Sequence, residues 1–136
     1  MKSVRSFILL SSFLSIIFLD SCKNNGPYKP DYENIGGYVI GKETCNIDET
    51  NDYWLIDFTY YPDQPQIGDT LSLNRITYTN VLKVKGLDQD LKHIGMKVAI
   101  DYNKISSRHL TMVCAVDSPI VYYLKEIFII SQGEIR

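Results

Sequence analysis

The chain begins with a long uncharged stretch and continues, after a polar segment, as short apolar runs separated by turn-forming residues. Residues 7–19 carry no charged side chain, and residues 23–35 are mostly polar and contain two prolines and a glycine. From residue 36 onward, β-branched and aromatic residues gather in short runs between Gly, Pro, Asn and Asp. This pattern predicts a domain of short strands joined by turns.

The apolar runs also predict where the strands lie and which faces they bury. The runs expected to form strands are residues 38–45, 53–60, 70–73, 76–84, 97–102, 110–116 and 121–131. The runs at residues 70–73 and 76–84 are predicted to form a hairpin with its turn at residues 74–75. In the run at residues 53–60, Trp54, Ile56 and Phe58 alternate with other residues. Side chains two apart share one face of a strand, so we expect these three to face the core.

One segment breaks the alternating pattern. Leu87, Leu91 and Ile94 are spaced at i, i+4 and i+7, which predicts a short helix or helical turn, and Gly95 suits its C-terminal end. Short strands, a single short helix and no repeat period predict an all-β fold closed, or nearly closed, into a small barrel.

The order of these elements resembles the OB-fold, a five-stranded Greek-key barrel with a helix in its middle connection. Residues 86–102 and 122–131 carry most of the resemblance. It implies a small OB-like Greek-key barrel with one short helix over residues 36–136, with a β-sandwich as the alternative. The same segments are similar to the OB-like modules of NigD-like proteins, among small Bacteroidetes-type lipoproteins of unknown function.

The amino-terminal segment has the parts of a secretory signal peptide. Lys2 and Arg5 precede the uncharged run, and a basic start followed by a short apolar stretch is typical of such peptides. As a helix the run would span about 20 Å, less than the roughly 30 Å hydrocarbon core of a membrane. Residues 1–21 are therefore expected to be a signal peptide, with a transmembrane anchor or a buried helix as alternatives.

The residues at the end of this run, Leu19-Asp20-Ser21-Cys22, resemble the lipobox of bacterial lipoproteins. The resemblance implies that the Cys22 sulfur carries lipid, palmitate-type chains included, and that Cys22 begins the mature chain. Asp20 departs from the pattern, and ordinary signal cleavage is the alternative. Residues 22–35 would then tether a single domain, residues 36–136, to the outer membrane or another envelope membrane. The sequence leaves open whether the domain faces the periplasm or the cell surface.

The net charge and the number of cysteines bear on the expected partners and on disulfide formation. The chain holds 14 Lys and Arg against 16 Asp and Glu, a net charge of −2, and no basic cluster. Nucleic-acid binding needs clustered cations, so no nucleic-acid partner is expected. If Cys22 carries lipid, Cys45 and Cys114 are the two cysteines that remain. An even number of cysteines in an oxidising compartment predicts one disulfide between them. Two free buried thiols or a redox-active pair are the alternatives.

Motifs of catalysis are missing from the sequence. His93 and His109 lie far apart and lack zinc-ligand spacing, and no Gly-x-Ser-x-Gly nucleophile motif occurs. Residues 46–52 offer several oxygens for calcium but lack the EF-hand order. We therefore expect no cofactor, no metal and no catalytic residues. A small hydrolase is the least favoured alternative, since glycosidase carboxylates pair in space rather than in sequence.

The chain's ten tyrosines and one tryptophan favour a binding role, although tyrosine is also simply a good strand residue. Tyr60 and Tyr61 beside a proline-rich loop, together with Trp54, are the candidate ligand-facing aromatics. The expected function is a non-catalytic interaction module that binds another envelope protein, and the alternative is a carbohydrate-binding accessory lipoprotein. Asp69-Thr70-Leu71 resembles a short Bacteroidetes-type O-glycosylation motif, which implies that Thr70 carries a glycan.

Overall fold

The computed structural model describes residues 33–136, so Cys22, the predicted signal peptide and most of the predicted tether lie outside the described residues. The elements in chain order are β1 (Glu33–Lys42), η2 (Glu49–Asn51), β2 (Trp54–Asp57), β3 (Asp69–Leu73), β4 (Ile76–Val84), η3 (Gln89–Leu91), β5 (Lys97–Ile105) and β6 (Glu126–Glu134). η2 and η3 are single 3₁₀ turns. No helix among the described residues has the length and apolar character needed to cross a membrane.

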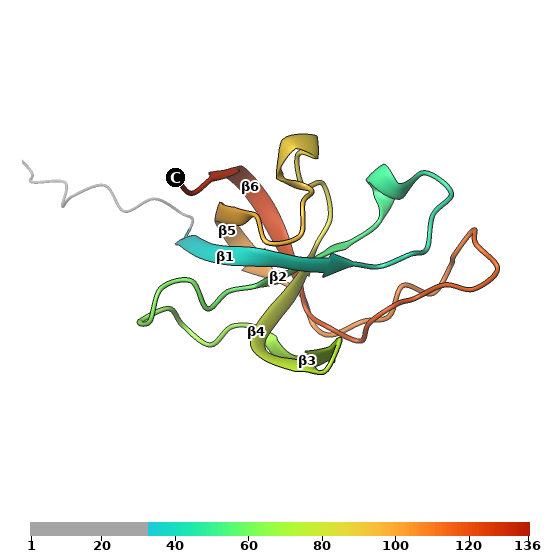
Figure 1. Ribbon diagram of the computed structural model, residues 1–136, viewed down its shortest axis with the longest axis horizontal. Coiled ribbons are helices and arrows are strands. Elements are labelled where there is room, and N and C mark those ends of the chain that lie inside the picture. The colour runs from blue at the N-terminus through green and yellow to red at the C-terminus, as the bar shows by residue number, and fades with distance from the viewer. Residues whose placement is uncertain (1–32) are drawn as a thin grey trace, which may run out of the picture. The chain divides into compact units, whose positions relative to one another are not determined.

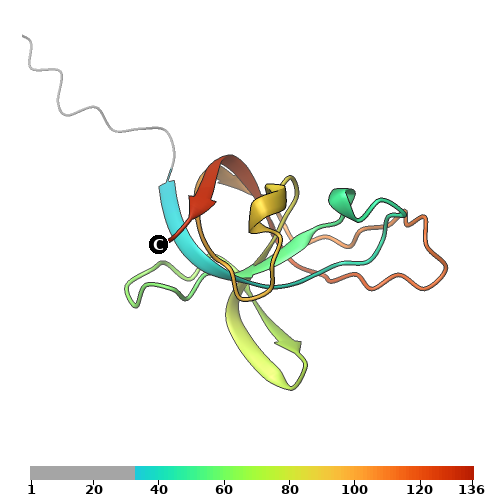
Figure 2. The ribbon, with the colours of Figure 1, turned by 45° about the horizontal axis from the view of Figure 1, so that its top comes forward.

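Five of the six strands close into a ring (Figures 1 and 2). β1 pairs with β2 and β5, β2 also pairs with β4, β4 pairs with β6, and β6 pairs with β5. Only the β4–β6 pairing is parallel. Each of these five strands therefore pairs with a neighbour on both sides, although β4 and β6 meet at only two residues of each strand. The predicted all-β fold is thus confirmed, and the order of the ring is that of the expected OB-like Greek-key barrel. The expected short helix is not formed: the segment between β4 and β5 contains only the 3₁₀ turn η3, and Ile94 is exposed rather than packed beside Leu87 and Leu91.

β3 lies outside the ring and forms a hairpin with β4, as predicted. The two residues between the strands, Asn74 and Arg75, have φ angles of 51° and 68°. Left-handed φ at both central positions defines the tight hairpin turn whose twist matches that of its strands. Asn adopts this conformation readily, whereas Arg does so at some cost.

The barrel interior is filled by one apolar cluster that draws on all five ring strands. Trp54, Ile56 and Phe58 of the second predicted strand all belong to it, as expected. The other fully buried members are Ile35, Val39, Leu82, Val84, Leu87, Leu91, Val98, Ile100, Tyr102 and Ile127. η3 contributes Leu91 and so caps one end of the barrel.

A second, smaller cluster lies on the outer surface of the barrel. Ile40, Leu55, Val81 and Leu124 form it. Leu55 is as deeply buried as its neighbours Trp54 and Ile56, so β2 is covered on both faces. The cover comes from the β3–β4 hairpin and from the long β5–β6 connection, residues 106–125, which we call the arm.

Several boundaries differ from the sequence prediction: β1 ends at Lys42, β2 at Asp57, β5 at Ile105 and β6 at Glu134, each at least three residues from its predicted end. β1 begins at Glu33, and Ile35 is buried, so the last tether residues belong to the barrel. The predicted strand at residues 110–116 is wrong, because this part of the arm makes no strand pairing. The nearest isolated β-bridge joins His109 to Leu124. β6 starts at Glu126, so residues 121–125 also belong to the arm.

Candidate functional site

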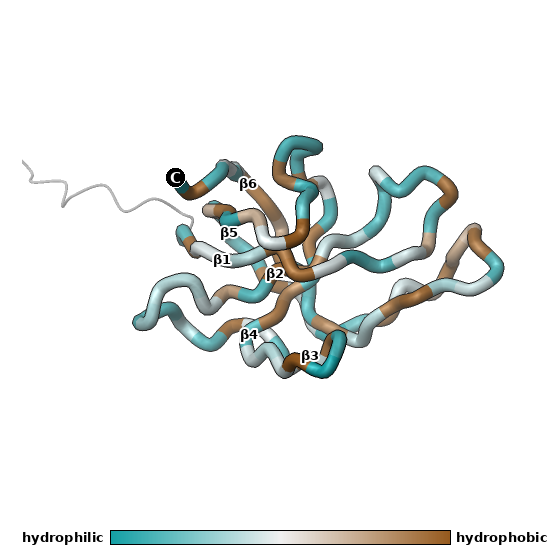
Figure 3. Tube along the Cα trace, in the orientation of Figure 1, coloured by the Kyte–Doolittle hydropathy of each residue, from teal (hydrophilic) through white to brown (hydrophobic). Residues whose placement is uncertain are grey.

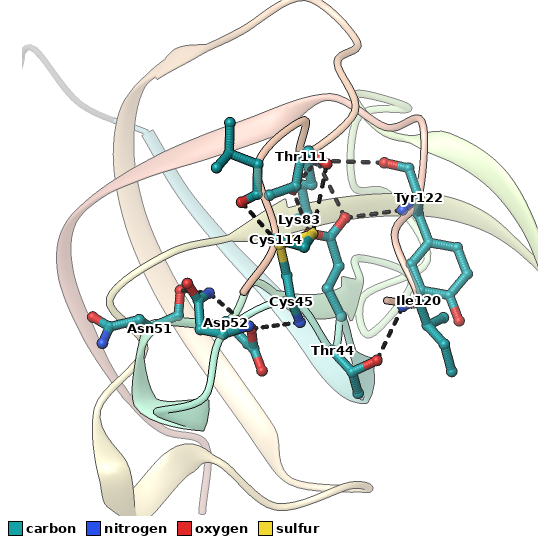
Figure 4. Close-up of a disulfide and its surroundings, with 12 residues drawn as sticks. Thr44, Cys45, Asn51, Asp52, Lys83, Thr111, Cys114, Ile120 and Tyr122 are labelled. Atoms are coloured by element: carbon teal, nitrogen blue, oxygen red, sulfur yellow. Dashed lines mark hydrogen bonds and ion pairs between the residues drawn. A yellow bond between two sulfur atoms is a disulfide. The ribbon is translucent and has the colours of Figure 1, made fainter. Parts of the chain in front are cut away.

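The arm is covalently joined to the β1–β2 loop, residues 43–53. Cys45 and Cys114 form a disulfide with an S–S distance of 2.05 Å, which confirms the pairing predicted from the sequence (Figure 4). Backbone hydrogen bonds reinforce the link. Thr44 and Ile120 exchange N–H···O bonds of 2.9 and 3.0 Å, and the Ala115 N–H donates to the Cys45 carbonyl at 2.7 Å. Two segments about 70 residues apart therefore behave as one rigid unit.

Beside the disulfide lies a buried ion pair. Lys83 comes from β4 and Glu43 follows β1, and both side chains are 0% exposed with Nζ and Oε1 3.2 Å apart. The Thr111 hydroxyl donates to Glu43 Oε2 at 2.6 Å, and the Tyr122 N–H donates to Oε1 at 2.9 Å. The Lys83 ammonium also donates to Thr111 Oγ1 and to the Tyr122 carbonyl, each at 3.3 Å. Thr111 and Tyr122 belong to the two sides of the arm, so this network holds the arm against the barrel (Figure 4).

Aromatic side chains complete the surroundings of the ion pair. The Lys83 ammonium lies 4.8 Å from the centroid of the Tyr53 ring, within the range of a cation–π interaction. Burial, with Glu126 adding to it, raises the pKa of Tyr53 to about 12. Burial, with the Glu43 charge adding to it, also raises the pKa of Tyr122. Both hydroxyls therefore stay protonated at neutral pH.

The acidic β1–β2 loop uses its carboxylates to fix its own backbone. Asp52 is buried and accepts hydrogen bonds from the N–H groups of Cys45 and Asn46 at 3.0 and 2.8 Å. Asp48 accepts from the N–H and hydroxyl of Thr50, and these hydrogen bonds lower the pKa of Asp48. Within residues 33–136, no three His, Cys, Asp or Glu side chains gather in a way that would hold a metal ion.

The base of the arm is clamped by Asp69, the first residue of β3. Its carboxylate accepts a hydrogen bond from Arg108 Nε at 2.7 Å and one from the Lys125 N–H at 2.9 Å. Arg108 and Lys125 lie at opposite ends of the arm. Burial raises the pKa of Asp69, but the hydrogen bonds and charges of Arg108 and Lys125 outweigh it and hold the pKa below its ordinary value of 3.8.

This clamp predicts acid sensitivity. A carboxyl with a lowered folded-state pKa stabilises the fold above its unfolded pKa and loses that contribution as pH falls through the folded value. Asp69→Asn is therefore expected to cost roughly 1–3 kcal/mol at pH 7, the usual range for a lost charged hydrogen bond. It should also flatten the decline in stability below pH 3.8. Urea unfolding across pH checks this, with Asp117→Asn in the exposed part of the arm as control. Parallel pH profiles for wild type and Asp69→Asn would contradict the clamp.

This rigid unit exposes several apolar side chains. Met112 is 84% exposed, Val113 is 88% exposed and Ile47 is 82% exposed. Leu110 and Ile120 are also exposed, and all five residues belong to the two loops that the disulfide joins. We call these five side chains the tip. Figure 3 shows hydrophobic stretches along both loops at the end of the barrel where they project together.

The candidate residues from the sequence are distributed over different parts of the barrel. Tyr60 is half-buried and Tyr61 is exposed, and their rings lie edge-on with centroids 4.6 Å apart. Tyr38 joins them at 5.4 Å from Tyr60. Trp54 is buried in the barrel core at 8% exposure, so it does not share a surface with the two tyrosines. Thr70 is exposed on β3, next to the clamped Asp69.

The ion-pair network and the tip were missed by the sequence interpretation. The signal for the network was Lys83 itself, a lysine within the apolar run Val81-Leu82-Lys83-Val84. A buried lysine needs a partner, but Glu43 is 40 residues away. For the tip, the apolar run 110–116 predicts a strand and gives no signal that its side chains are exposed.

Comparisons with family models, with curated proteins and with solved structures found no match to this chain.

Proposed function

We propose that the chain is a lipid-anchored envelope protein whose barrel is a non-catalytic module that docks on another envelope protein through the tip. The observation that carries this proposal is the exposure of Met112, Val113 and Ile47 on loops that the disulfide holds rigid. Exposed apolar side chains that gather on one surface mark interaction sites. A rigid surface also loses less conformational entropy on binding than a mobile loop would.

The charge distribution favours a protein partner over a lipid surface. Residues 110–124 contain one charged residue, Asp117, and residues 43–53 contain no Lys or Arg. Peripheral binding to anionic lipid depends on cations, which the tip lacks. An apolar groove rimmed by basic side chains, on the other hand, would complement the acidic residues of the β1–β2 loop.

The position of the tip also suits docking by an anchored protein. The described chain enters the barrel at Glu33, and the ten residues of β1 lead from there toward the β1–β2 loop (Figure 1). A strand of that length spans about 30 Å. The tip thus lies at the end of the barrel opposite the point where the described chain enters it.

The proposal is tested with the full chain expressed in its native type of host. Wild type is expected in the membrane fraction and, after mild detergent extraction, in a complex larger than the monomer. Cys22→Ser should leave the membrane fraction, because it cannot be lipidated. Val113→Asp should stay in the membrane fraction but lose the complex, since a desolvated charge opposes apolar docking. At 88% exposure the substitution should change folding stability by at most about 0.5 kcal/mol.

The matched control is Ile94→Asp, a second exposed apolar side chain that lies outside the tip. It should keep both the membrane location and the complex. Membrane retention of Cys22→Ser would refute the lipid anchor alone. A complex that survives Val113→Asp, or is lost equally in Ile94→Asp, would refute docking through the tip.

A further inference from the structure

A small hollow lies apart from the tip, between the two 3₁₀ turns. Its volume is about 250 Å³, and it is lined by Lys42, Glu49, Thr50, Trp54, Gln89 and Lys92. Glu49 and Thr50 belong to η2, and Gln89 belongs to η3. Figure 2 shows η2 and η3 on the same side of the barrel. Pockets for drug-sized ligands start at roughly 300 Å³, so this hollow suits a ligand with a single ring.

The aromatic part of the lining holds an unusual nitrogen. Trp54 Nε1 is buried and has no hydrogen-bond partner, and it is the one such side-chain nitrogen or oxygen between residues 33 and 136. An unpaired buried donor is costly and needs an explanation. Because this nitrogen is itself buried, a ligand in the hollow would meet other atoms of the Trp54 side chain.

The polar part of the lining contains both signs of charge. The Lys42 ammonium pairs with Glu49 and lies 5.9 Å from the centroid of the Trp54 ring. Lys92 Nζ donates to the Thr50 carbonyl at 3.1 Å. An anionic ligand would meet the Glu49 carboxylate, and a cationic ligand would meet two ammonium groups. The lining therefore favours a neutral ligand.

We infer that the hollow binds one neutral sugar ring. Sugar hydroxyls donate to carboxylates, carbonyls and amide oxygens, and they accept from ammonium, amide and indole N–H groups. Lys42, Lys92 and Gln89 supply donors, Glu49 and Gln89 supply acceptors, and Trp54 supplies the aromatic wall. This combination of an apolar wall with a few convergent polar groups is typical of small-ligand sites. The inference is independent of docking through the tip.

The single tryptophan of the chain makes the hollow directly observable. In a ¹H–¹⁵N spectrum of the full chain, held in a detergent without a sugar headgroup, only Trp54 gives an indole N–H signal. The probes are glucose, galactose, mannose and N-acetylglucosamine, with glycerol as an acyclic polyol. We expect at least one sugar to shift the indole signal saturably, with a dissociation constant on the order of 1 mM, and glycerol to leave it in place.

Two variants and one matched control locate the binding. Lys42→Met and Gln89→Ala should each raise the apparent dissociation constant of the sugar at least about threefold, because each removes a donor or acceptor from the lining. The dissociation constant is read from the titration of the indole signal. Lys104→Met removes a lysine that lies 5.5 Å from the Phe128 ring, outside the hollow, and should leave the affinity unchanged. Gln89 is on an exposed turn, so its variant is expected to fold even if Lys42→Met does not.

The inference is overturned if no sugar in the panel moves the indole signal at concentrations well above 1 mM. It is also overturned if glycerol moves the signal as much as the sugars do. Equal affinity in wild type and in Gln89→Ala would place the binding elsewhere and overturn it as well.

Discussion

Lys83→Met is expected to lower the free energy of unfolding by about 3–5 kcal/mol. The substitution keeps most of the side-chain volume but leaves the Glu43 carboxylate, 0% exposed, without its counter-ion. Thr111 and Tyr122 still donate to Glu43, but two hydrogen bonds do not replace a full charge in a buried position. Urea unfolding followed by circular dichroism measures the loss, which should appear as a lower midpoint with an unchanged slope.

The double variant Lys83→Met, Glu43→Met distinguishes the loss of the ion pair from the cost of leaving one charge buried without its partner. Replacing both charges by apolar groups removes the uncompensated charge, so the double variant should be more stable than Lys83→Met alone. The Thr111 hydroxyl and the Tyr122 N–H then lose their acceptor, so recovery is expected to be partial. Lys104→Met, at an exposed position, is the control and should cost less than about 0.5 kcal/mol. A loss below about 1 kcal/mol for Lys83→Met would contradict the role given to the buried pair.

The second large effect is expected from the disulfide. Replacing Cys45 and Cys114 together by alanine should lower the free energy of unfolding by about 4 kcal/mol, because the bond closes a loop of about 70 residues in the unfolded chain. The barrel strands do not depend on the bond, so the double variant should keep its circular dichroism spectrum. The arm should open more often, which amide hydrogen exchange at Ala115 and Ile120 would detect, since both N–H groups bond to the β1–β2 loop.

A reductant provides the internal control for this prediction. Under reducing conditions the wild type should unfold at nearly the same urea concentration as the double alanine variant. The variant itself should not respond to reductant, because the described domain holds no other cysteine. Equal stability of the oxidised wild type and the variant would contradict the stabilising role of the bond.

Local patterns in the sequence were enough to predict the architecture of the barrel. The alternation of Trp54, Ile56 and Phe58 identified a core face, and Asn74–Arg75 marked the hairpin turn. The arm could not be predicted in this way. Residues 110–116 are as apolar as a strand, but Thr111 and Cys114 bind Glu43 and Cys45 on another loop, and no neighbouring strand pairs with the segment.

The candidate site was less accessible from the sequence, because its parts are distant along the chain. The disulfide followed from counting cysteines, once Cys22 was assigned to lipid. The partner of Lys83 depends on a contact across 40 residues, which no local pattern encodes. The exposure of Met112 and Val113 likewise depends on how the arm folds over the barrel. The aromatic residues Tyr60 and Tyr61 stood out in composition, whereas the structure directs attention to aliphatic side chains at the other end of β1.

Docking through the tip is tested most directly by cross-linking in living cells. A photo-reactive amino acid at position 113 should give a discrete covalent adduct with one partner protein, and the adduct should disappear when Met112 is changed to Asp in the same chain. The same amino acid at position 94, also exposed, should give no such adduct. Adducts of equal yield from both positions, or none from position 113, would contradict the claim.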